Sequence, residues 1–68
     1  MSQQFVPIVV PMLSMANTAY TLERQMRIYS AAPRLTPQAI EAMKAGVARM
    51  REQLDEVDAA INQLVPTA

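Results

Sequence analysis

The clearest helix signal in the chain lies in residues 35–64, LTPQAIEAMKAGVARMREQLDEVDAAINQL. Thr36 can cap a helix N-terminus through its hydroxyl group, and loss of such a cap costs about 1 kcal/mol. Pro37 then falls at the first helical position, where its missing N–H group is not needed. Because Pro66 disfavours helix at the residue before it, we predict a helix over residues 37–64.

Apolar residues recur through this predicted helix in alternating steps of three and four residues. An unbroken row of this kind over more than three heptads is typical of a coiled-coil seam. The alternative is the wider apolar stripe of an amphipathic core helix. The row consists of Ile40, Met43, Val47, Met50, Leu54, Val57, Ile61 and Leu64.

The first half of the chain repeats the same spacing in Phe5, Ile8, Met12, Met15, Ala19, Leu22, Met26 and Tyr29. If the chain folds back at Pro33, the two rows pair member by member, from Tyr29 with Ile40 to Phe5 with Leu64. A short connection between two helices makes them antiparallel neighbours. The sequence therefore predicts an all-α fold, an antiparallel helical hairpin of two long helices packed as a coiled coil.

Two prolines set the predicted start of the first helix. Proline is tolerated in a first turn but breaks a helix interior, and Pro7 and Pro11 both lie near the beginning of the apolar row. We therefore predict an uncharged N-terminal arm over 1–10, a helix over 11–32, a link over 33–36 and the helix over 37–64, all in a single domain.

The composition excludes several kinds of chemistry. The chain has no Cys and no His, and its six basic and six acidic residues give zero net charge. Disulfides, thiolate zinc sites, histidine metal ligands and a histidine general base are therefore ruled out. We predict no enzymatic activity, no metal site and no cofactor. The acidic group Glu52, Asp55, Glu56 and Asp58 is interpreted as a solvated face, and the neutral balance argues against a nucleic-acid partner.

The length of the chain favours self-association. A domain of 68 residues buries only about 60% of its unfolded surface, so a partner subunit is a common source of stability. We expect a homodimer of hairpins, a four-helix bundle, or a higher oligomer. The alternative is that the alanines beside the seam are only good helix formers on a solvated face. The predicted oligomer interface contains Leu13, Ala16, Gly46, Gln53 and Ala60.

The favoured functional hypothesis is a protein-binding module, an adaptor or an inhibitor that occupies a partner's surface, such as a phage or plasmid accessory factor. Aromatic residues and arginines dominate interface hot spots. The candidate contact residues are accordingly Tyr20, Arg24, Arg27, Tyr29 and Arg34, with Phe5 and Ile8 of the arm as a second candidate surface.

Two further hypotheses remain at this stage. The first is an oligomer that sequesters a small phosphorylated ligand or nucleotide, because arginines near the link could grip a small anion. The second, weaker one is a membrane-surface role for the uncharged first 22 residues. Ser14, Asn17 and Thr18 interrupt that stretch, and a spanning helix needs about 20 apolar residues. We therefore expect a cytoplasmic protein rather than a membrane one.

Overall fold

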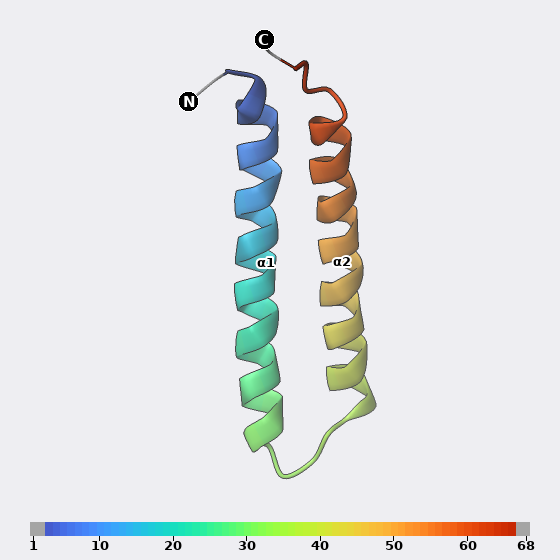
Figure 1. Cartoon of the computed structure of the whole chain (residues 1–68). Helices are drawn as coiled ribbons and strands as arrows, with labels where there is room; N and C mark the ends of the chain where they lie inside the picture. The colour runs from blue at the N-terminus through green and yellow to red at the C-terminus, as the bar shows by residue number, and fades with distance from the viewer. Residues whose placement is uncertain (1–2, 67–68) are drawn as a thin grey trace.

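A computed structural model describes residues 3–66 as a short 3-10 helix and two long α-helices. Helix η1 covers Gln3–Phe5, α1 covers Val6–Ala31 and α2 covers Pro37–Ile61. The two long helices lie side by side and antiparallel, with the start of α1 and the end of α2 at one end of a rod and the link at the other (Figure 1). No strand occurs in residues 3–66. The predicted all-α hairpin is confirmed, and it is one helix thick, with principal extents of 58 × 18 × 14 Å.

The N-terminus of α2 has the predicted cap. Thr36 has extended backbone angles, and its Oγ1 accepts a hydrogen bond from the backbone N–H of Ala39 at 3.1 Å. This bond satisfies one of the N–H groups that a helix start leaves without an intrahelical partner. The α-helix ends at Ile61, three residues before the predicted end, and tighter turns with backbone bonds such as Leu64 N–H to Ile61 O (3.0 Å) follow it.

Helix α1 begins at Val6, five residues earlier than predicted. Pro7 lies in the first turn, where proline is tolerated. Pro11 lies inside the helix and is buried, and its missing N–H leaves only the carbonyl group of Pro7 without an intrahelical donor. Residues 3–10 of the predicted arm are therefore η1 and the first turns of α1, while residues 1 and 2 of that arm lie outside the described part.

The open end of the hairpin is tied by a side-chain amide. Gln4 Oε1 accepts a hydrogen bond from the Val65 backbone N–H at 3.0 Å, and Gln4 Nε2 donates to the Val65 carbonyl oxygen at 3.4 Å. The two bonds join residues that are 61 positions apart. They set the start of η1 and the segment after α2 at the same level of the rod.

The helices meet along a seam that only half matches the predicted one. One half of each predicted row is buried or half-buried, namely Ile8, Met15, Leu22, Tyr29, Met43, Met50, Val57 and Leu64. The other half is exposed, except for the half-buried Ala19. Residues one position earlier in the sequence take its place, and these are Gln4, Pro11, Thr18, Gln25, Ala39, Gly46, Gln53 and Ala60.

Gly46 gives the physical reason for this rotated seam. A Cβ atom placed on Gly46 would lie 3.0 Å from Leu22 Cδ1, closer than ordinary van der Waals contact. Leu22 is 8% exposed and Ala39, on the same edge of α2 as Gly46, is 7% exposed. Small residues on that edge let the helices approach closely, and the larger apolar residues next to them are turned outward.

We expect Gly46→Leu to lower the free energy of unfolding by about 1–3 kcal/mol, because the added side chain must displace Leu22. Urea denaturation at a fixed protein concentration, followed by circular dichroism, measures this change. Ala59→Leu at an exposed position of α2 is the control, with a change within about 0.5 kcal/mol. Equal stabilities of the two variants would contradict the close approach at Gly46.

Candidate functional site

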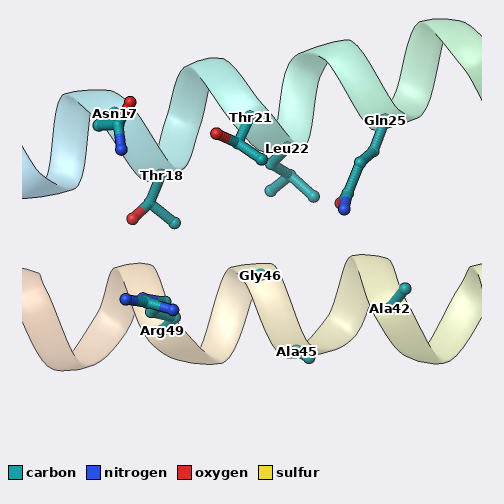
Figure 2. A pocket seen from close by; sticks show the side chains of 9 residues that line it. All are labelled: Asn17, Thr18, Thr21, Leu22, Gln25, Ala42, Ala45, Gly46 and Arg49. Carbon is teal, nitrogen blue, oxygen red and sulfur yellow. The ribbon is translucent and has the colours of Figure 1, made fainter.

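The hairpin has two unlike faces, one on each side of the seam. One face carries a groove, here called the polar groove, in which side chains of α1 stand opposite small residues of α2 (Figure 2). Leu22 and Gln25 point from α1 toward α2 in this view, and Arg49 lies on α2 beneath Thr18. The groove has a volume of about 320 Å³. It is lined by Asn17, Thr18, Thr21, Leu22, Gln25, Ala42, Ala45, Gly46 and Arg49.

Arg49 is the charged residue of the polar groove. It also borders a second hollow with Glu52 and Glu56, and neither ion pair found in residues 3–66 involves it. The hydroxyl group of Thr18 donates to the Ser14 carbonyl oxygen at 3.0 Å. The proton of the Thr18 hydroxyl is thus engaged, and the donors that the groove can offer a small polar ligand are the Arg49 guanidinium, the Asn17 and Gln25 amides and the Thr21 hydroxyl.

The opposite side of the seam carries the exposed apolar residues, here called the apolar face. Its α1 members are Met12 and Met26, and its α2 members are Ile40, Val47, Leu54 and Ile61. Each follows by one residue a seam position on the side of its helix that carries the polar groove, and a one-residue step turns a helix by about 100°. Because the helices are antiparallel, this turn carries both rows to the same side of the hairpin.

The apolar face is continuous across both helices. A hollow of about 420 Å³ lies between them, lined by Met15 and Leu22 of α1 and by Val47, Met50 and Leu54 of α2, with Arg51 at its edge. Leu54 is 54% exposed and Met12 is 44% exposed. Soluble monomers rarely leave contiguous apolar patches of more than a few hundred Å² open to water.

The predicted contact residues near the link do not form one cluster. Tyr20 is 60% exposed and lies on the outer side of α1, two residues from the seam residue Leu22. Arg24 and Arg34 are exposed, while Tyr29 is half-buried in the seam. These residues do not line either face described above.

Arg27 is held on its own helix by Glu23. Its Nε lies 2.6 Å from Glu23 Oε1, and its Nη2 donates to Glu23 Oε2 at 2.7 Å. This two-point contact raises the pKa of Arg27, chiefly through the hydrogen bond and then through the charge of Glu23. The guanidinium group is solvent-exposed and keeps its charge at any physiological pH.

The remaining predicted site residues fall into separate places. Phe5 is 46% exposed and Ile8 is half-buried at the open end. The predicted oligomer interface is divided, because Leu13 and Ala16 lie exposed on α1 while Gly46, Gln53 and Ala60 lie at the seam between the helices of one chain. Their predicted contacts between chains stay a prediction.

The polar groove was not predicted from the sequence. Thr18 and Gln25 are seven residues apart and half-buried, and a heptad-spaced polar pair beside an apolar row could have indicated it. At the α2 side of the seam, Gln53 Oε1 is buried and meets no donor among the described residues. The apolar periodicity alone cannot distinguish these polar residues from polar residues on a solvated outer face.

Comparison with known proteins gives no relative: no family model, no curated protein and no solved structure matches the chain.

Two searches for particular sites complete the description. Within residues 3–66, no group of three His, Cys, Asp or Glu side chains is arranged to hold a metal ion. Within Gln3–Ala31, an 18-residue window is long and apolar enough to cross a membrane, with a mean hydropathy of 1.4 and 6% of the window buried. Core helices and signal sequences have the same length and composition, so this property alone does not establish a spanning segment.

Proposed function

We propose that the chain is a self-associating helical module that binds another protein, with the apolar face as its self-association surface. The continuous apolar face is the observation that carries this proposal. Leu22, Ala39 and Val57 are the apolar residues, apart from Pro11, that a single hairpin buries among those described. Two copies packed face to face would enclose the large side chains that one copy leaves in water, as a four-helix bundle does.

Such an arrangement leaves the outer side of α1 free for a partner. Tyr20 and Arg24 are exposed there, and these residue types are frequent among interface hot spots. Arg27 lies one turn further along with its charge held outward by Glu23. Occupying a partner's surface, as an adaptor or an inhibitor does, requires no catalytic group on this chain.

A second candidate function is association with a membrane surface, and it is favoured by the apolar stretch Gln3–Ala31. Helix α1 carries no charge before Glu23, and it runs without a break through both prolines. Its apolar residues are not confined to one side, since Val10 is 61% and Leu13 66% exposed. Helices that lie in a membrane interface usually carry Lys or Arg on a polar face, which ranks this candidate second.

Leu54→Glu tests the self-association surface. We expect it to weaken the dimer by about tenfold or more, because docking would bury an unpaired carboxylate. Sedimentation equilibrium at micromolar concentration measures the shift toward monomer. Val10→Glu is the matched control, since Val10 is also apolar, 61% exposed and outside both the apolar face and the predicted oligomer interface. A wild-type protein that stays monomeric and folded would refute the proposal.

A capture experiment tests the partner surface. We expect the double substitution Arg24→Glu with Arg27→Glu to keep the helical signal and the oligomeric state but to lose the protein that the wild-type chain captures from its host. Each like-charge contact on one helix costs only a few tenths of a kcal/mol, so folding should survive. Undiminished capture would remove these arginines from the contact surface.

Co-sedimentation with vesicles separates the two candidate functions. We expect the wild-type chain to stay in the supernatant with vesicles of phosphatidylcholine and phosphatidylserine. Binding that is lost in Val10→Asp, a substitution outside the apolar face, would instead favour the membrane candidate.

A further inference from the structure

We propose that two copies dock through the apolar face in parallel, with α1 of each copy lying on α2 of the other and both links at the same end. This orientation rests on the proposed self-association and adds to it the direction in which the second copy runs. Two two-fold arrangements can bring the apolar faces together, one with the axis along the rod and one with the axis across it.

The levels of residues along the rod distinguish these arrangements. Leu22 is level with Gly46 near the middle, and Gln4 is level with Val65 at the open end. An axis along the rod keeps every residue at its level, so α1 meets the second copy's α2 at equal heights. An axis across the rod reverses the levels, and each helix then meets its own copy running the other way.

The apolar residues match in the parallel arrangement. Met26 lies two to three residues from the level of Ile40, and Met12 lies two to three residues from the level of Leu54, which is about 3–5 Å along a helix. Both rows repeat every seven residues, so one matched pair places the next pair as well. The spacing that matches α1 with α2 within one chain therefore also matches α1 with the second copy's α2.

The charged residues at the border of the apolar face favour the same orientation. Glu23 borders the face on α1 and is level with residues 45 and 46 of α2, one to two residues from Lys44. Parallel docking therefore brings Glu23 next to the second copy's Lys44, and the two-fold axis makes this contact twice. The two side chains are 52% and 70% exposed in the single hairpin, so both can reach a second copy.

The opposite orientation is less well matched in charge. If its axis crosses midway between the exposed Val47 and Leu54, this orientation pairs Lys44 with the second copy's Asp58. It then brings Arg51 against the second copy's Arg51 near the axis. It also places Glu23 beside the uncharged first half of α1. In the parallel arrangement the two Arg51 side chains are separated, each facing that uncharged part of the other copy's α1.

Distances between spin labels test the orientation directly, since the chain has no Cys. Ala32→Cys puts a label next to the link, and Asn17→Cys puts one near mid-length on the side away from the apolar face. For the Ala32 label we expect a distance below about 30 Å, from neighbouring helix axes about 10 Å apart and the label arms. The reversed dimer would give more than about 40 Å. The Asn17 label gives nearly the same distance in both.

The outcomes separate the two proposals. Short distances at both positions support the parallel dimer. A short distance at Asn17 with a long one at Ala32 overturns the orientation and leaves self-association standing. Absence of any dipolar signal at Asn17 at concentrations of tens of micromolar overturns self-association and the orientation with it.

Charge exchange gives an independent test. We expect Glu23→Lys to weaken the dimer about three- to tenfold, as two exposed ion pairs are replaced by repulsion. Combining it with Lys44→Glu should restore the wild-type dissociation constant, because the two residues then attract again between copies. Within one chain Glu23 pairs with Arg27 and Lys44 with Glu41, so loss of those pairs alone would make the double variant worse. No recovery would refute the contact.

Discussion

The close approach of α1 and α2 at Gly46 is the constraint on which the rest of the structure depends. Leu22 packs against the glycine itself, and the small residues Ala39 and Ala60 lie on the same edge of α2, with Gln53 between Gly46 and Ala60. Dispersion contacts are strongest where backbones come close, so this edge turns inward in preference to the bulkier row beside it. That choice sets the rotation of both helices and thereby decides which residues remain in water.

The two faces of the hairpin follow from that rotation. On one side, small residues of α2 and polar residues of α1 leave a groove with Arg49 at its edge. On the other side, larger apolar residues such as Val47 and Leu54 stay exposed. A chain of this size gains little stability from the few side chains that it buries alone. Enclosing the apolar face would supply the missing burial, and the opposite face would remain open.

The sequence predicts the hairpin because local signals agree over its whole length. The cap at Thr36, the seven-residue repeat and the proline at the link each indicate the same two helices. The start of α1 was less predictable. The rule that proline breaks a helix describes average helix interiors. Pro11 lies close enough to the start of α1 that only one carbonyl group loses its hydrogen-bond donor. Predicting the polar groove would have required knowing which edge of each helix faces the other.

What the sequence by itself determined is the number of helices, their approximate bounds, the direction of the fold and the apolar spacing that the helices share. What only the tertiary structure decided is which of two neighbouring rows forms the seam. Both rows have the same period, so periodicity cannot choose between them. The choice depends on how closely two backbones can approach, which is a property of the pair and not of either helix alone. Seven of the sixteen apolar residues predicted for the interior, including Ile40 and Val47, lie at the surface for this reason.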